Sequence, residues 1–184
     1  MTDPLAVFLA CSDLDDLTAA YDALPDSPDV SSRAVDVVQA WTDVQAVANL
    51  LLHASVLPPD VRSQAVLRGL REPGYLQVAA AVGAGQLDPA HLDDGVRRTV
   101  LDALLDVVAS DAGPAGVRAS AELGPYLHAD ELELLDDLAA HPLDAVRHNL
   151  TQARLMVTDP SQQRSVLLPY LPDLADTGSA QTSP

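Results

Sequence analysis

Apolar residues recur at helical spacing along most of this chain. Val146, Leu150, Ala153 and Val157 follow one another at steps of three or four residues, so they form one apolar stripe on a helix. Runs in which β-branched and polar residues alternate, as in a strand, are weak. Clusters of Pro, Gly and Asp repeatedly interrupt the helical pattern. The pattern therefore predicts an all-α fold of about ten or eleven short helices joined by tight turns.

The apolar stretches and the breaks between them give approximate bounds for the helices. The expected ranges are 4–10, 13–24, 29–41, 43–54, 60–70, 75–82, 94–108, 117–127, 130–139, 144–157 and 162–171. N-caps are expected at Ser12-Asp13, at Thr42-Asp43 and at either Asp93 or Asp94. Asp144 is expected to be the N-cap of the helix that ends near Val157. Residues 1–175 are expected to form one helical-repeat domain, with capping helices in 1–28. Residues 176–184 are expected to be a disordered tail.

Four of these stretches open with the same dipeptide. The pairs are Val61-Arg62, Val96-Arg97, Val117-Arg118 and Val146-Arg147, at intervals of 35, 21 and 29 residues. Two-helix repeats recur at about 30 to 47 residues, so two of the three intervals fit short repeats. The shortest interval indicates a disturbed register near Asp111. Each repeated Arg is expected to tie one repeat to the next rather than to contact a ligand.

The sequence around these pairs resembles the HEAT-repeat family, including its short bacterial forms, over residues 29–158. The matching motifs are Pro59-Asp60-Val61-Arg62-Ser63-Gln64-Ala65, Asp94-Gly95-Val96-Arg97, Gly116-Val117-Arg118-Ala119-Ser120-Ala121 and Leu143-Asp144-Ala145-Val146-Arg147. The resemblance implies a right-handed α-α superhelix, which is a short solenoid of stacked helical hairpins. It also implies a ladder of Asp–Arg contacts between neighbouring repeats.

The residues that the resemblance assigns to this ladder are Asp60, Arg62, Asp94, Arg97, Arg118, Asp144 and Arg147. Arg62, Arg97 and Arg147 are each expected to lie near the carboxylate of a turn Asp. Arg118 departs from the motif, because no Asp closely precedes it.

The composition is acidic and poor in aromatic residues. There are 27 Asp and Glu against 10 basic residues, all of them Arg, for a formal charge of −17. Such a surface repels phosphate groups, so direct binding to nucleic acid or to an anionic membrane is not expected. The acidity fits solubility in a chain from a GC-rich genome, adaptation to a salty cytoplasm, or binding to a basic partner. With 3% aromatic residues, the core is expected to consist of Leu, Val and Ala, with Trp41 packed between helices.

The first third of the chain is its most acidic part. Residues 1–60 contain ten Asp and one Arg. Six of these Asp form a candidate docking face for a basic partner: Asp13, Asp15, Asp16, Asp22, Asp26 and Asp29. The alternative interpretation is a solvated outer surface on a capping repeat. The run lacks the Gly and the terminal Glu of a calcium loop, so it does not predict calcium binding.

No catalytic or metal-binding motif stands out along the sequence. The five His residues include no His-Glu-x-x-His pattern, so no metal ion or other cofactor is expected. Cys11 lies in an apolar run without a neighbouring base, where a thiol is inert and acts as a small buried hydrophobe. A single cysteine cannot build a disulfide framework, which fits a reducing cytoplasm. No apolar run approaches the ~20 residues that span a bilayer.

The sequence therefore predicts a non-catalytic, cytoplasmic scaffold or adaptor whose concave helix surface binds another protein. Two alternatives remain open. The first is an acidic inhibitor or nucleic-acid mimic that occupies a basic site on its partner. The second is a lyase-like accessory factor of the HEAT-containing phycobilin-lyase type, for which the sequence shows no catalytic constellation.

Overall fold

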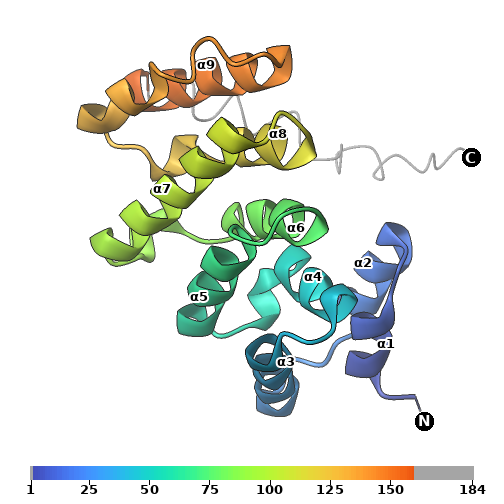
Figure 1. Ribbon diagram of the computed structural model, residues 1–184. Helices are drawn as coiled ribbons and strands as arrows, with labels where there is room; N and C mark the ends of the chain where they lie inside the picture. Colours follow the sequence, from blue (N-terminus) through green and yellow to red (C-terminus); the bar gives the residue numbers. More distant parts are fainter. Residues whose placement is uncertain (1, 160–184) are drawn as a thin grey trace, which may run out of the picture.

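The computed structural model describes residues 2–159, and the fold over this range is all-helical, with no strand (Figure 1). The α-helices are α1 (Pro4–Ala10), α2 (Leu14–Asp22), α3 (Pro28–Ala40), α4 (Val44–Leu52), α5 (Pro59–Gly69), α6 (Tyr75–Ala84), α7 (Asp94–Ser110), α8 (Pro114–Ala121) and α9 (Asp144–Thr158). Short 3₁₀ helices lie between them: η1 (Ala54–Val56), η2 (Pro89–His91), η3 (Gly124–Tyr126) and η4 (Ala129–Leu135). The all-α prediction is confirmed. The predicted helix at 162–171 and the predicted tail at 176–184 lie outside the described residues.

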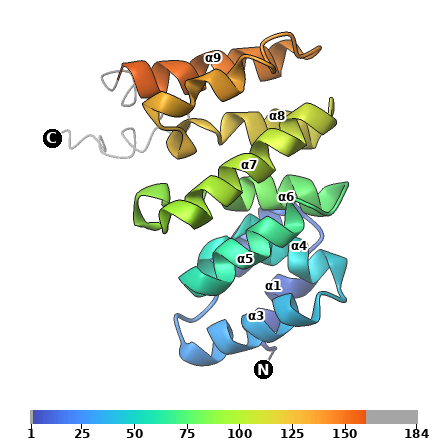
Figure 2. The ribbon, with the colours of Figure 1, turned by 60° about the vertical axis from the view of Figure 1, so that its left-hand side comes forward.

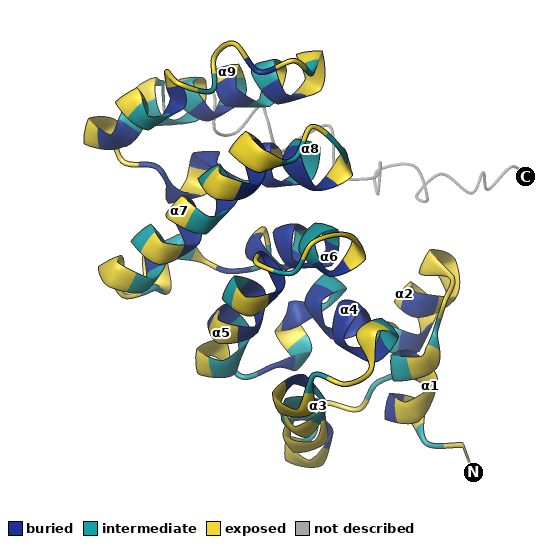
Figure 3. Ribbon diagram, viewed as in Figure 1, coloured by how far each residue is buried: buried dark blue, intermediate teal, exposed yellow. Residues whose placement is uncertain are grey.

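The helices pair in chain order and follow one another along the molecule (Figures 1 and 2). α3 packs on α4, α5 on α6, and α7 on α8. α4, α6, α8 and α9 form one row in which each helix packs on the next, and α5 packs on α7 in a second row. α1 and α2 pack on each other, and α1 covers α4 at the N-terminal end. One apolar core therefore runs from α1 to α9, and Figure 3 shows the buried residues on the facing sides of the helices.

Small residues let the helix backbones approach closely at the centre of this core. A Cβ atom added to Gly83 of α6 would lie 2.7 Å from the carbonyl oxygen of Leu51 in α4. A Cβ atom added to Gly69 of α5 would lie 2.7 Å from the Cβ of Ala80. Real Cβ atoms do not come so close to their neighbours, because interiors are already packed to van der Waals contact. Glycine at these two positions is what permits the spacing of α4, α5 and α6.

Most helices begin where the sequence indicates. The Asp13 carboxylate accepts hydrogen bonds from the first turn of α2, Asp43 from that of α4 and Asp93 from that of α7, as the sequence predicted. The prediction that Asp144 is the N-cap of α9 is wrong, because Asp144 is the first residue of the helix and Leu143 occupies the N-cap position. The Asp144 carboxylate instead pairs with Arg147 one turn further along the helix.

The segment after α8 differs from its prediction. The sequence predicted an α-helix over 130–139, but the chain forms the 3₁₀ helix η4 followed by turns. Glu133 has Asp130 three residues before it and Asp136 and Asp137 three and four residues after it. An α-helix would stack these like charges on one face, which is destabilising. The predicted helix over 117–127 is likewise divided into α8 and η3, since Gly and Pro follow α8 at 124 and 125.

A buried amide joins the first helix to the fourth. Asn49 of α4 is fully buried, and its Nδ2 donates to the carbonyl oxygens of Phe8 at 2.9 Å, Leu9 at 3.2 Å and Cys11 at 2.9 Å. Gln45 donates to the Oδ1 of Asn49 at 2.9 Å. α1 has only seven residues, so few carbonyl groups at its end find a backbone donor. The Phe8 carbonyl also accepts from the N–H of Cys11 at 3.3 Å, and the Cys11 carbonyl also accepts from Gln45 at 2.9 Å. The Asn49 amide therefore compensates the burial of the carboxyl end of α1.

Replacing Asn49 should cost more stability than replacing an exposed polar residue. The change Asn49→Ala removes the side-chain donor to the Leu9 carbonyl and one of two donors to each of the Phe8 and Cys11 carbonyls, so the free energy of unfolding should fall by about 1 to 3 kcal/mol. Urea denaturation followed by circular dichroism measures this change. The matched control is Gln64→Ala on the exposed face of α5, which should stay within about 0.5 kcal/mol of the wild type. Equal effects of the two changes would contradict the capping role of Asn49.

Candidate functional site

The six Asp of the predicted docking face are all exposed and lie at the N-terminal end of the molecule. They occupy the N-cap, the first turn and the last residue of α2, the loop after it and the first turn of α3: Asp13, Asp15, Asp16, Asp22, Asp26 and Asp29. The six lie on consecutive segments of the chain, and two of them, Asp22 and Asp26, line one pocket. We call these six residues the acidic face.

The acidic face has little compensating positive charge. Only Asp29 forms an ion pair among the described residues, with Arg33 at 3.7 Å. Arg33 is engaged mainly by Asp3, which lowers the pKa of the Asp3 carboxyl and raises the pKa of the guanidinium. Asp13 accepts two backbone N–H groups of α2. The other five carboxylates of the acidic face therefore lie without an arginine partner among the described residues.

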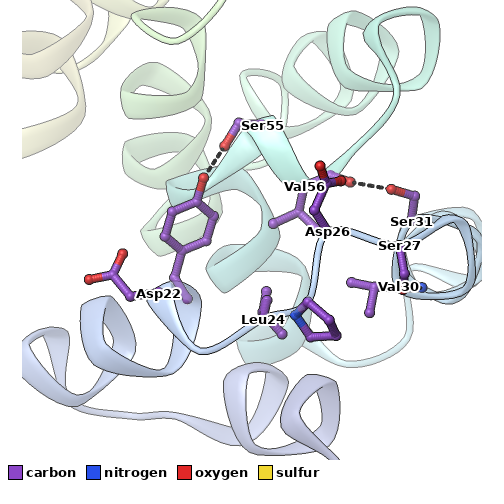
Figure 4. A pocket seen from close by; sticks show the side chains of 10 residues that line it. Asp22, Leu24, Asp26, Ser27, Val30, Ser31, Ser55 and Val56 are labelled. Atoms are coloured by element: carbon purple, nitrogen blue, oxygen red, sulfur yellow. Dashed lines mark hydrogen bonds between the residues drawn. The ribbon is translucent and has the colours of Figure 1, made fainter.

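A pocket of about 340 Å³ opens between α2, α3 and η1, beside the acidic face (Figure 4). Its lining consists of two Asp of the acidic face, hydroxyl-bearing residues and apolar residues: Tyr21, Asp22, Leu24, Pro25, Asp26, Ser27, Val30, Ser31, Ser55 and Val56. Its volume lies at the lower end of the range typical of small-ligand sites. The sequence did not predict this pocket, because its walls come from segments that are far apart along the chain.

Hydrogen bonds and ring stacking hold the pocket walls in place. The Tyr21 hydroxyl and Ser55 Oγ are hydrogen-bonded at 2.8 Å, and Ser31 Oγ donates to the Val56 carbonyl at 3.3 Å (Figure 4). The imidazole of His53 stacks on the Tyr21 ring with 4.4 Å between ring centroids. Burial lowers the pKa of His53, and the charge of Asp22 partly opposes that shift. The Tyr21 ring is thus held by a stacked imidazole on one face and by a hydrogen bond at its hydroxyl, and the lowered pKa of His53 favours the neutral imidazole at neutral pH.

The predicted Asp–Arg ladder is present only within single helices. Arg97 pairs with Asp94 at 2.9 Å and Arg147 pairs with Asp144, in each case across the first turn of one helix rather than between repeats. The expectation for Arg62 is wrong. Its guanidinium donates to the carbonyl oxygens of Leu57 at 2.9 Å and Ser55 at 3.1 Å, and it pairs with no carboxylate in the described part of the chain.

Arg62 donates to backbone carbonyl groups rather than to the carboxylate of Asp60. Asp60 is exposed to solvent, where an ion pair contributes little. Leu57, the residue that ends η1, is buried, and its carbonyl accepts from both Nε and Nη2 of Arg62. Arg118 also departs from the ladder and pairs with Glu122 of its own helix end. Burial raises the pKa of Glu122, an effect that the charge of Arg118 partly offsets.

A buried charge cluster that the sequence did not predict joins α7 to η4. Arg97 is only 5% exposed, and its Nη1 and Nη2 donate to the two carboxylate oxygens of Glu131 at 2.8 and 3.0 Å. Arg98 donates to the same carboxylate at 2.9 Å, and so does the backbone N–H of His128 at 2.8 Å. Arg97 also donates to the Tyr126 carbonyl. These donors, Arg97 first, lower the pKa of Glu131 to about 2.

This cluster is structural, because its members satisfy one another. Each carboxylate oxygen of Glu131 already accepts from at least one Arg, so neither is free for a substrate or a metal ion. A local signal for Glu131 existed in the sequence. Its carboxylate reaches back to the N–H of His128, three residues before it, in a capping-box arrangement. Nothing local, however, identified Arg97 as its partner.

Trp41 packs against the core from the surface rather than within it. The ring is half-buried, and the Arg68 guanidinium lies over it, 4.3 Å from the ring centroid. Trp41 ends α3 in the left-handed conformation with φ of 51°. The expectation of a core tryptophan between helices therefore holds only in part. Since Arg68 covers the ring, Trp41 is not a free anchor for a partner.

The other candidate chemistry of residues 2–159 concerns metal ions, the membrane and the single cysteine. His, Cys, Asp and Glu side chains in this range form no group of three that could hold a metal ion. None of the described helices is long and apolar enough to cross a membrane. Cys11 is half-buried beside the core. Comparison with known proteins identifies no matching family model, curated protein or solved structure.

Removing the buried arginine should destabilise the fold far more than removing an exposed one from the same motif. Arg97→Met leaves Glu131 without its bidentate partner, so the free energy of unfolding should fall by about 3 to 5 kcal/mol. Arg147→Met removes a largely exposed ion pair and one hydrogen bond to the His141 carbonyl, and should cost about 1 to 2 kcal/mol. Chemical denaturation of both variants measures the difference. Similar losses would show that the Arg97–Glu131 contact does not stabilise the packing of α7 on η4.

The Glu131 pKa predicts a pH dependence with a defined sign. The carboxyl titrates at about 2 in the folded chain and near its ordinary value of 4.5 when unfolded, so protonation favours unfolding. Its contribution is complete above pH 4.5 and is lost as the pH falls towards about 2. The stability gap between the wild type and Glu131→Gln should therefore be largest at neutral pH and shrink over this range, as measured by thermal unfolding. Glu133→Gln, an exposed change in the same segment, should leave stability close to wild type throughout.

Proposed function

We propose that this chain is a non-catalytic protein-binding scaffold built from HEAT-like helical hairpins. The serial packing of α3 on α4, α5 on α6 and α7 on α8 supports this proposal, as does the recurrence of an Arg in the first turn of α5, α7 and α9. In this proposal the hairpins form a short right-handed solenoid, and the chain belongs to the HEAT-repeat family. Such arrays offer extended surfaces on which other proteins dock.

The acidic face carries the proposal. Of its six exposed Asp, one forms an ion pair among the described residues, and two others line a pocket. Uncompensated charge of one sign raises the rate of encounter with a partner of opposite charge and disfavours partners of the same charge. The partner is therefore a protein with a basic surface, and not a nucleic acid or an anionic membrane. A cytoplasmic location is part of the same proposal.

A second surface of different character lies between consecutive hairpins. A groove of about 620 Å³ runs along α6, the end of α7 and the start of α8. It includes Tyr75, which is 47% exposed, together with Val78, Pro114 and Ala115. An apolar groove binds by burying surface and keeps its affinity in salt, whereas an acidic face loses affinity as salt screens its charges. Salt dependence therefore separates the two surfaces.

An acidic inhibitor or nucleic-acid mimic is the alternative that a specific observation favours. The same uncompensated carboxylates could occupy the nucleic-acid site of a basic protein, in place of phosphates. In that case nucleic acid and this chain compete for one surface of the partner. The lyase-like accessory factor has no comparable observation in its favour among residues 2–159.

The test is direct binding to a basic partner recovered from the native lysate and then purified. Affinity should fall at least tenfold between about 50 and 500 mM salt. Replacing four carboxylates of the acidic face should have the same effect at low salt: Asp15→Asn, Asp16→Asn, Asp22→Asn and Asp26→Asn. The control carries an equal charge change on exposed residues elsewhere: Asp106→Asn, Asp130→Asn, Glu133→Gln and Asp137→Asn.

The control variant should keep affinity within about threefold of the wild type, because its changed residues lie outside the docking face. Binding that is unaffected by salt and by the acidic-face variant would move the site to the apolar groove. Recovery of no protein partner at either salt concentration would overturn the scaffold itself. Competition by added nucleic acid would favour the mimic over the scaffold.

A further inference from the structure

We propose that the pocket between α2, α3 and η1 binds the guanidinium group of an arginine side chain. It would be the point at which the basic partner inserts an anchoring residue, and in this respect the inference rests on the proposed function. Three features of the pocket support it: its charge, the hydrogen-bonding capacity of its walls and its shape.

The charge of the pocket favours a cation. Asp22 and Asp26 line it, and neither forms an ion pair among the described residues. Figure 4 shows Asp22 on the α2 side and Asp26 on the opposite side, near Val56. The nearest arginine along the chain, Arg33, is held by Asp3 and Asp29 and does not neutralise them. A cation between the two sides would receive compensation that this chain does not supply itself.

The walls of the pocket present hydrogen-bond acceptors. The Tyr21 and Ser55 hydroxyls share one hydrogen bond at 2.8 Å, so lone pairs on this pair remain available. Ser31 Oγ uses its proton on the Val56 carbonyl and keeps its lone pairs. A guanidinium has five N–H donors and no acceptor, so it suits an acceptor-rich wall that also carries carboxylates. A ligand carboxylate or phosphate would be repelled.

The shape favours arginine over lysine. The floor and sides include the apolar side chains of Leu24, Pro25, Val30 and Val56, which can cover the methylene stem of a long side chain. A planar guanidinium is more weakly hydrated than an ammonium group and reaches acceptors in several directions at once. The walls are also preorganised, because the stack with His53 and the bond to Ser55 hold the Tyr21 ring. Little ordering is then needed on binding.

The test uses small probes on the full-length chain and observes its backbone amides by NMR. Titration with N-acetyl-arginine amide should shift the signals of Tyr21, Ser31, Ser55 and Val56 in a saturable way. N-acetyl-citrulline amide has a planar group of similar shape without the charge. N-acetyl-lysine amide has the positive charge but no planar guanidinium. Each of these two should bind at least about fivefold more weakly than the arginine probe.

Two variants with the same change in net charge locate the site. Asp22→Asn combined with Asp26→Asn should weaken binding of the arginine probe about tenfold or more. Asp15→Asn combined with Asp16→Asn lies on the same helix, away from the pocket lining, and should change it less than about threefold. An unchanged spectrum outside the pocket shows that each variant is folded. Equal effects of the two pairs, or no saturable shift in the pocket, would overturn the proposal.

The probes separate this inference from the scaffold proposal. If the arginine probe binds saturably but no basic protein partner is recovered from the lysate, the pocket is supported and the scaffold is overturned. A basic partner whose affinity is unchanged by the Asp22 and Asp26 substitutions would support the scaffold and overturn the pocket as its anchor.

Discussion

The carbonyl groups left unpaired at the ends of short helices constrain this whole structure. The described α-helices have between 7 and 17 residues, so helix ends make up a large share of the backbone. Side chains from other segments supply the missing donors. Asn49 caps the end of α1, Gln77 donates to Leu70 at the end of α5 at 2.8 Å, and the Tyr126 hydroxyl donates to Ala84 at the end of α6 at 2.6 Å. Each of these hydrogen bonds joins two elements and fixes their relative position more precisely than apolar packing alone.

The repeated Val-Arg pairs acquire a physical meaning from the same constraint. Arg62, Arg97 and Arg147 each stand in the first turn of a helix, and each donates to a backbone carbonyl of a 3₁₀ helix end or turn. These carbonyls belong to Leu57, Tyr126 and His141. The Val-Arg motif therefore marks helix starts whose Arg binds the backbone of an irregular segment. The Asp of the expected ladder are additional partners for Arg97 and Arg147 only. Arg118 donates to no such carbonyl within residues 2–159 and pairs with Glu122 instead.

The acidic face has few positive neighbours, because most of the arginines contact other parts of the molecule. Arg97 and Arg98 share Glu131 in the interior, Arg68 covers Trp41, and Arg62 caps η1. The N-terminal end has Arg33 alone, which is occupied by Asp3 and Asp29. Buried charges in the middle of the molecule are thus satisfied by the chain itself, whereas the carboxylates on α2 and the loop after it are left for solvent or a partner. Residues 1–60 contain ten Asp and a single Arg, and this local charge imbalance is what directs the functional proposal to one end of the molecule.

The sequence by itself determined the helical class, most helix bounds and the caps at Asp13, Asp43 and Asp93, because these depend on interactions within a few residues. It identified the acidic residues, but not that two of them would line a pocket. Only the tertiary structure decided which donor meets which acceptor. Asn49 reaches Phe8 across 41 positions and Arg97 reaches Glu131 across 34, so no local pattern could pair them. Tertiary packing also decided that Arg62 would turn to backbone carbonyls, because an unpaired carbonyl in the fold is a better partner than an exposed carboxylate.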